Sequence, residues 1–182
     1  MSPDPGSSKL LKAGFVQIDA SGKSSRVVVF QYNPETLSRQ LEAVSPALPP
    51  RETVTFTVFF DAADQLDAGN PLTQQAGVLP ALSALQILLY PASGSVLVWV
   101  TGSRQVTPVH ITTMQIIEQA FDATLNPIRA EVTITLRLLK DSDLSTSPRG
   151  QAIWNAYLAQ LQQLAQAYSS TISFGDLGLS GI

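Results

Sequence analysis

The stretch Asn126–Leu139, NPIRAEVTITLRLL, decides the fold predicted for this chain. Its even positions from Ile128 to Leu138 are apolar, and its odd positions from Arg129 to Arg137 are polar. A strict period of two is typical of a strand with one apolar and one polar face. β-branched residues are frequent in it, as a half-buried pleated surface prefers. Long strands of this kind are typical of antiparallel sheets, often barrels or sandwiches.

Working outward, five more segments have the patterns of strands. Glu52 to Phe60 alternates Val54, Phe56, Val58 and Phe60 with threonines, and Val106 to Phe121 is long but changes phase near Thr112-Thr113. One inserted residue there predicts a β-bulge. The loop 122–127 would make this strand the antiparallel neighbour of the opening stretch. The remaining strands are expected at 9–19, 26–32 and 95–101, with a hairpin turn at 20–23.

Three helical segments are expected. Asn33-Pro34-Glu35 predicts a short helical turn over 33–37, because Asn is a good N-cap and Pro fits the first helical position. Residues 79–90 have helical spacing of leucines and are expected to pack on the sheet. Residues 148–168 carry an apolar stripe opposite a row of amides, with no charge between Arg149 and Asp176. That amide face suits either water or a docked second chain. We expect loops or connectors at 43–50, 61–77 and 141–148.

Together these elements predict an α+β fold. It is a mainly antiparallel β-barrel or sandwich, with one packed helix at about 79–90 and a C-terminal helix at about 148–168. The expected organisation is a disordered N-terminus (1–8), a β domain (9–143), and a linker, helix and tail (144–182).

The composition limits the classes of partner. Charged residues make up 14% of the 182 residues, against about 25% in ordinary soluble domains. Low charge suits protein interfaces, although it also suits a plain β-rich domain with Thr and Gln on its surface. No basic run or stripe points to nucleic acid. Pro80, Pro91 and Gly94 interrupt the longest apolar stretch, 78–100, so no membrane insertion is expected. We expect synthesis in the cytoplasm, because no apolar leader is present.

Catalytic signals are weak. His110 is the only histidine and lies within a predicted strand, and there is no cysteine. Asp61, Asp64 and Asp67 lie three apart but lack the alternating ligands and closing Glu of a calcium loop. The common nucleotide and hydrolase motifs are missing. We therefore predict no enzyme, no cofactor and no metal, and expect His110 to be structural.

Three segments, taken in order, resemble the N-terminal domain of contractile injection system tube-type proteins, which includes the inner baseplate component of phage-tail-like particles. The first is VFQYNPETLSR (Val29–Arg39), the second FTVFFD (Phe56–Asp61) and the third AFDATLNPIRAEVTITL (Ala120–Leu136). The resemblance covers about residues 9–143. Many members carry a C-terminal LysM-like module, whereas this chain has only the helix at 148–168 there.

The resemblance implies a structural protein, similar to tube proteins, that assembles as a homo-hexamer between the inner tube and the baseplate. The particle could stay in the cell or be released. The family-motif residues are expected to have structural or interface roles: Phe30, Tyr32, Asn33, Pro34, Phe59, Phe60, Asp61, Pro127, Arg129 and Ala130. For Arg129 we predict a charge-assisted bond across the polar face or to a neighbour.

Three other readings stay open. One is an adaptor at the cap end of the tube. The second is a monomeric ligand- or carbohydrate-binding β-barrel that uses Trp99 or Trp154 as a platform. The third is a hydrolase with an unrecognised site, which would need a deep pocket that places His110 beside a carboxylate.

Overall fold

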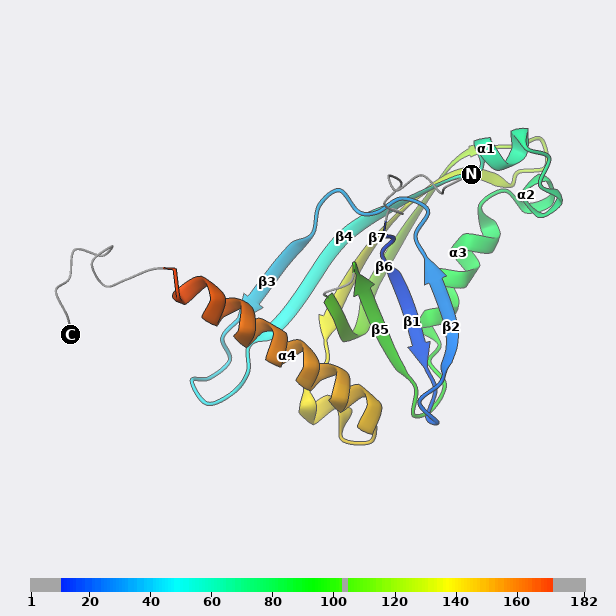
Figure 1. Cartoon of the computed structure of the whole chain (residues 1–182). Helices are drawn as coiled ribbons and strands as arrows, with labels where there is room; N and C mark the ends of the chain where they lie inside the picture. The colour runs from blue at the N-terminus through cyan, green and yellow to red at the C-terminus, as the bar shows by residue number, and fades with distance from the viewer. Residues whose placement is uncertain (1–10, 103–104, 172–182) are drawn as a thin grey trace, which may run out of the picture.

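The computed structural model describes residues 11–102 and 105–171. Its seven strands form one antiparallel sheet in the order β2-β1-β5-β6-β7-β4-β3 (Figure 1). The strands are β1 (Gly14–Ile18), β2 (Ser24–Val29), β3 (Ser38–Glu42), β4 (Arg51–Asp61), β5 (Val96–Thr101), β6 (Gln105–Phe121) and β7 (Pro127–Leu138). The helices are α1 (Ala63–Asp67), α2 (Pro71–Ala76), α3 (Leu79–Gln86) and α4 (Pro148–Ser169), with 3₁₀ turns η1 (Ile87–Leu89) and η2 (Asp141–Leu144).

Strand β7, which falls within Asn126–Leu139, lies between the two other long strands, β6 and β4. It pairs with β4 from Thr53↔Arg137 to Asp61↔Arg129, and with β6 from Val109↔Leu138 to Phe121↔Pro127. Its even side chains, from Ala130 to Leu138, are buried. The predicted alternation of β7 is therefore confirmed, and its apolar face forms the centre of the core.

The sheet curls strongly toward its apolar face. Phe56 of β4 stacks on Trp99 of β5 with ring centroids 5.4 Å apart, although β7 and β6 lie between these strands. In a flat sheet three strand spacings would separate them by about 14 Å. The side chain of Gln31 spans the gap between the segment after β2 and β4, because it donates to the Asp61 carbonyl (2.8 Å) and accepts from the Asp61 N–H (2.9 Å). The predicted mainly antiparallel α+β class is confirmed, as one curled sheet in which the end strands β2 and β3 do not pair with each other.

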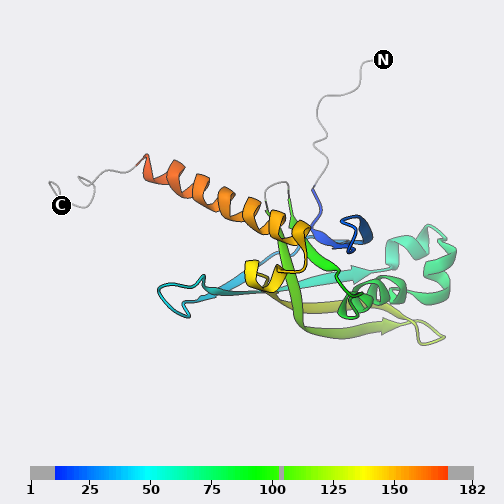
Figure 2. The same cartoon turned by 90° about the horizontal axis from the view of Figure 1, so that it is seen from below.

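The helices lie at different sides of the sheet (Figures 1 and 2). Leu82 and Leu85 of α3, with Leu88 of η1, are buried in the core. The first half of α4 packs on the body through Trp154 and Tyr157, whereas its second half extends away from it in both views. No helix within residues 11–102 and 105–171 has the length and apolar character needed to cross a membrane.

Several predicted elements are confirmed, although their bounds differ: the strand expected at 9–19 is β1 (Gly14–Ile18), the one expected at 26–32 is β2 (Ser24–Val29), and the connector expected at 141–148 contains the 3₁₀ turn η2. The β1–β2 hairpin, β4, β5, the β6–β7 hairpin and α4 all form. The register shift between Ile111 and Thr113 is the predicted bulge. Helix 79–90 forms as α3 followed by the 3₁₀ turn η1. The predictions for residues 1–8 and for the end of the tail lie outside the described residues.

Two predictions were wrong. Residues 33–37 form no helix, because the Asn33 side chain bonds to the segment before β1 instead: Asn33 Oδ1 accepts from the Ala13 N–H and Nδ2 donates to the Leu11 carbonyl, each at 2.8 Å. Residues 61–77 are not a plain loop but contain α1 and α2. Asn70 caps α2 by accepting from the backbone N–H groups of Leu72 and Thr73, and Pro71 starts it.

Strand β3 was missed altogether. Its sequence, SRQLE, is exposed at every position, so no apolar alternation marks it. It forms because its backbone pairs with β4, from Ser38↔Thr55 to Glu42↔Arg51. Such a strand at the end of a sheet leaves one row of N–H and C=O groups free for pairing.

Candidate interaction surface

The outer face of β4, β7 and β6 is a broad surface with few charges. Register places its side chains in rows across the three strands. We define this threonine face by nine residues: Thr55, Thr135 and Thr113 in one row, Thr57, Thr133 and Gln115 in the next, and Phe59, Glu131 and Ile117 in the third. Glu131 is the one charged member. Covering such a surface with another chain costs less desolvation than covering a charged one.

The threonines of this face also bond to each other. The hydroxyls of Thr55 and Thr135, and those of Thr57 and Thr133, lie 3.1 Å apart. Cross-strand Thr pairs stabilise a sheet by roughly 0.2–1 kcal/mol each. These bonds link β4 to β7 at the centre of the face without adding charge to it.

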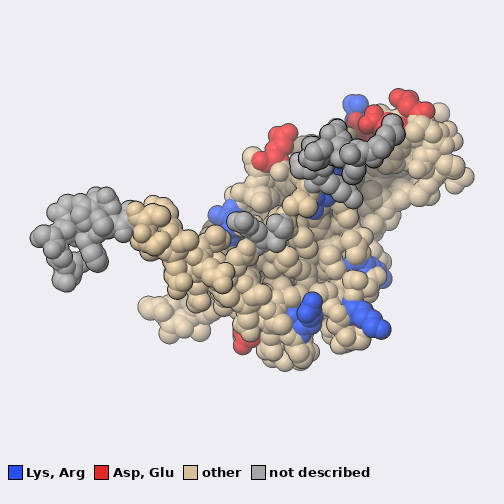
Figure 3. Space-filling model, viewed as in Figure 1, with Lys and Arg blue, Asp and Glu red and all other residues tan. Residues whose placement is uncertain are grey.

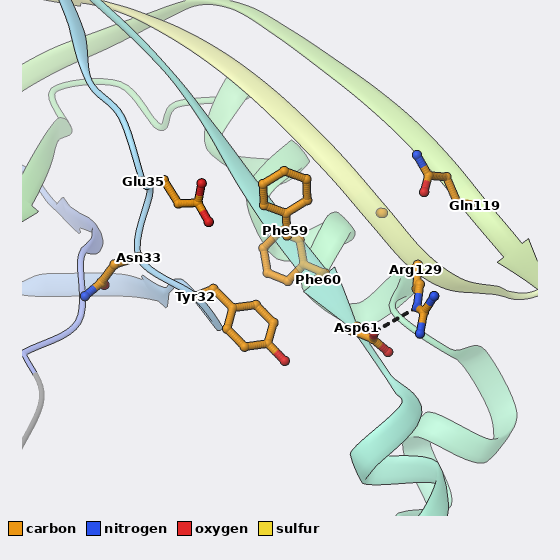
Figure 4. Close-up of a pocket in the computed structure, with 9 residues that line it drawn as sticks. Tyr32, Asn33, Glu35, Phe59, Phe60, Asp61, Gln119 and Arg129 are labelled. Atoms are coloured by element: carbon orange, nitrogen blue, oxygen red, sulfur yellow. Dashed lines mark hydrogen bonds and ion pairs between the residues drawn. The ribbon is translucent and has the colours of Figure 1, made fainter.

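A shallow pocket of about 350 Å³ lies at one end of the threonine face (Figure 4). The connector after β2 contributes Tyr32, Asn33 and Glu35. Strand β4 contributes Phe59, Phe60 and Asp61, and Gln119, Arg129 and Ala130 come from β6 and β7. Three parts of the chain that are far apart in sequence therefore meet here.

An ion pair forms the polar wall of this pocket. Arg129 Nε donates to Asp61 Oδ2 at 2.8 Å, and the two residues are direct cross-strand partners. The other oxygen of Asp61, Oδ1, accepts from the Ala63 N–H at the start of α1. The predicted charge-assisted bond of Arg129 is confirmed, and it lies within the chain. The Arg129 side chain remains 58% exposed, so the pair by itself adds little to stability.

The structure brings seven of the ten family-motif residues to this pocket. They are Tyr32, Asn33, Phe59, Phe60, Asp61, Arg129 and Ala130. Phe30 is instead buried in the core, with its ring 5.4 Å from that of Phe15. Pro127 is buried at the start of β7, where its carbonyl accepts from the Val78 N–H. Pro34 lies half-buried in the connector.

Sequence reasoning missed Gln31, Glu35 and Gln119. Gln31 lies inside the quoted motif VFQYNPETLSR, but nothing local reveals that its amide reaches a residue thirty positions away. Gln119 could have been found from the alternation after the bulge, which places it in one row with Arg129 and Asp61. The position of Glu35 depends on the path of the connector and has no sequence signal.

A second polar cluster fixes the direction of α4. Arg39 of β3 donates to Glu52 of β4 through Nε (2.7 Å) and to the Tyr157 hydroxyl through Nη2 (2.9 Å). Burial raises the pKa of the Tyr157 phenol and the charge of Glu52 raises it further, although Arg39 opposes this. Burial alone would lower the pKa of Arg39, but its bond and charge interaction with Glu52 raise it overall.

The residues considered for catalysis, metal binding or ligand binding do not form a common site. His110 is exposed, and the pocket of about 120 Å³ beside it is lined by apolar residues and Ser95, without a carboxylate. Asp61 ends β4, whereas Asp64 and Asp67 belong to α1. Within the part of the chain that the structure describes, no three His, Cys, Asp or Glu side chains are grouped to hold a metal ion. Trp99 and Trp154 are both buried, so neither offers the exposed platform that the ligand-binding reading needs.

Charge is sparse on the face seen in Figure 3. Single Lys, Arg, Asp and Glu side chains are separated by wide uncharged areas, and the projecting part of α4 carries none. Large apolar side chains are exposed around the threonine face, with Phe121 50% and Leu125 78% exposed.

Comparison with known proteins adds no relative: no family model matches the chain, and no curated protein matches it.

Proposed function

We propose that this chain is a non-enzymatic structural adaptor of a contractile injection system, forming a homo-hexameric ring that joins the inner tube to the baseplate. The observation that carries the proposal is the threonine face, with one charge among nine side chains over three long strands. A surface that is polar but uncharged can meet water in the free chain and another chain in an assembly.

The sheet ends support a ring rather than a closed pair. The strand order starts at β2 and ends at β3, and these two exposed end strands differ in sequence. A contact between two different edges is head-to-tail, and a head-to-tail contact that closes on itself produces a ring. Both ends offer backbone groups for strand pairing.

The resemblance supplies the rest of the proposal. Residues from all three similar segments line the pocket that contains the Asp61–Arg129 pair. Motif residues that are distant in sequence are therefore close together in the structure. We assign them a structural role: they join the connector, β4 and β7 at the end of the face that other chains would contact.

Assembly of the purified chain tests this function. We expect mass photometry and negative-stain imaging to show rings at high concentration, and rings bound to tube ends when inner tube protein is added. Thr133→Lys places a charge in the centre of the threonine face and should abolish assembly. The matched control, Gln74→Lys on the exposed surface of α2, should assemble normally.

Circular dichroism separates loss of contact from loss of fold, because Thr133→Lys should retain the wild-type spectrum. A wild-type chain that stays monomeric and never joins tube protein contradicts the proposal, as does unchanged assembly of the Thr133→Lys variant.

A further inference from the structure

One edge of β4 is only partly paired. Strand β3 covers it along residues 51–55, and at its far end the Gln31 side chain bonds to both the N–H and the carbonyl of Asp61. Alternate residues of an antiparallel strand direct their backbone groups to the same edge, so those of Thr57 and Phe59 face the same side as those of Asp61. Among the described residues, none bonds to the backbone groups of Thr57 or Phe59 on this side. A gap in the pairing therefore lies between β3 and Gln31.

The pocket of about 350 Å³ lies beside this gap. Two aromatic side chains line it, Tyr32 from the connector and Phe59 from β4, and they are 46% and 47% exposed. Figure 4 shows the side chains of Tyr32 and Glu35 extending from the connector toward β4. One cation already contacts the Tyr32 ring, because Lys12 Nζ lies 6.0 Å from its centre. Exposed rings of this kind attract the charged ends of Lys and Arg side chains.

The charge beside the two rings is negative. Glu35 lines the pocket with Phe59, and Glu131 is the cross-strand partner of Phe59. Neither carboxylate forms an ion pair with another residue of the described chain, whereas Asp61 is paired with Arg129. A basic side chain placed beside Phe59 would therefore meet two unpaired carboxylates and two aromatic rings.

We propose that this gap binds an extended segment of a partner protein that carries a Lys or Arg residue. The segment runs antiparallel to β4, its backbone pairs with Thr57 and Phe59, and its basic side chain lies between the rings of Phe59 and Tyr32. Strand addition of this kind takes its affinity from backbone hydrogen bonds and its specificity from the pocket. Because β3 and Gln31 occupy the two ends, the pairing is limited to the stretch opposite residues 56–60. The proposal does not depend on the ring, because it uses an edge of β4 and neither end strand of the sheet.

Three capped, fluorescein-labelled pentapeptides test the proposal on the full-length chain. The first is Thr-Thr-Arg-Thr-Thr, and the second has Glu in place of Arg. The third has the first sequence with N-methyl groups on the nitrogens of Arg and of the last Thr, which face β4 in the proposed pairing. Fluorescence anisotropy measures the dissociation constant of each peptide. We expect the second and third to bind about tenfold more weakly than the first, because one loses the charge contact and the other the backbone bonds.

Two substitutions locate the site. Glu35→Gln and Glu131→Gln each remove one carboxylate, and each should weaken binding of the Arg peptide by about threefold. The matched control, Asp64→Asn, removes the same charge from an exposed position of α1 outside the pocket and should bind like the wild type.

Each part of the proposal has its own contrary result. Equal affinity of the Arg and Glu peptides overturns the basic partner, and equal affinity of the N-methylated peptide overturns the strand pairing. The site itself is overturned if the Arg peptide does not bind, or if a chain with both Glu35→Gln and Glu131→Gln binds it as tightly as the wild type.

Discussion

Asp122 shows how one exposed carboxylate can hold a turn. It follows β6 and accepts hydrogen bonds from the backbone N–H groups of Thr124 and Asn126 and from both of their side chains. The bonds from Asn126 are the main cause, and those from Thr124 a further one, of a pKa lowered to about 2 from the ordinary 3.8. Bonds to the charged form favour that form.

The low pKa of Asp122 predicts a pH dependence of stability. The folded chain keeps this carboxylate charged at a pH where the unfolded chain has protonated it, so its stabilisation is present above pH 3.8 and is lost as the pH falls toward about 2. Thermal unfolding of Asp122→Asn should be less sensitive to pH in this window than that of the wild type. Asp67→Asn, on the exposed end of α1, should behave like the wild type. Identical curves for Asp122→Asn and the wild type would contradict the prediction.

The raised pKa of Tyr157 predicts that stability decreases at alkaline pH. Burial, and then the charge of Glu52, raise its pKa above 10.0, so the folded chain keeps the phenol proton after the unfolded chain has lost it. The stabilisation is therefore full below pH 10 and is lost as the pH rises through the higher folded pKa. Tyr157→Phe should lose about 1 kcal/mol at neutral pH with the bond from Arg39, and its stability should fall less above pH 10.

Denaturant unfolding at pH 7 and pH 10.5 measures both effects. Tyr168→Phe is the control, because Tyr168 is 70% exposed near the end of the same helix. An equal loss of stability above pH 10 in Tyr157→Phe and in the wild type would show that the phenol is not the titrating group.

Among the elements, those with a strong period could be predicted and those that depend on distant partners could not. β4, β7 and α4 follow from alternation or helical spacing, and the β6 bulge follows from a change of phase, because each pattern reflects a face that is buried. β3 has no buried side chain and exists through pairing with β4. Asn33 had the local chemistry of a helix cap, but its bonds to Leu11 and Ala13 prevailed.

The candidate site could likewise be predicted only in part. The family-motif residues could be selected from the sequence, yet their meeting at one pocket depends on the curl of the sheet. The stacking of Phe56 on Trp99, which no sequence pattern predicts, is the contact that demonstrates this curl. Gln31 is the clearest case, because its role is to join two elements that no sequence pattern relates.

The link through Gln31 predicts an effect on the whole curled sheet. Gln31→Ala removes two hydrogen bonds to the Asp61 backbone and should cost about 1–3 kcal/mol in denaturant unfolding. Gln31→Glu should be no better, because a carboxylate can accept from the Asp61 N–H but cannot donate to the Asp61 carbonyl. Gln119→Ala, at an exposed position of the same pocket, should stay within about 0.5 kcal/mol of the wild type. Wild-type stability of Gln31→Glu would contradict this role.

At the scale of the whole molecule, three features agree. The threonine face is polar but uncharged, the sheet ends in two unlike strands, and α4 leaves the body with the apolar stripe of its second half exposed. The last two are unfavourable in a monomer, since exposed strand ends and exposed apolar helix faces favour aggregation. All three favour a chain that is surrounded by other chains.

The number of chains in one particle tests this account most directly. Native mass spectrometry of the purified full-length chain, from low to high micromolar concentration, should show a closed complex of six copies that grows at the expense of the monomer. It should show no open-ended series of larger species. A spectrum that contains monomer alone at every concentration, with inner tube protein present as well as absent, would contradict the account.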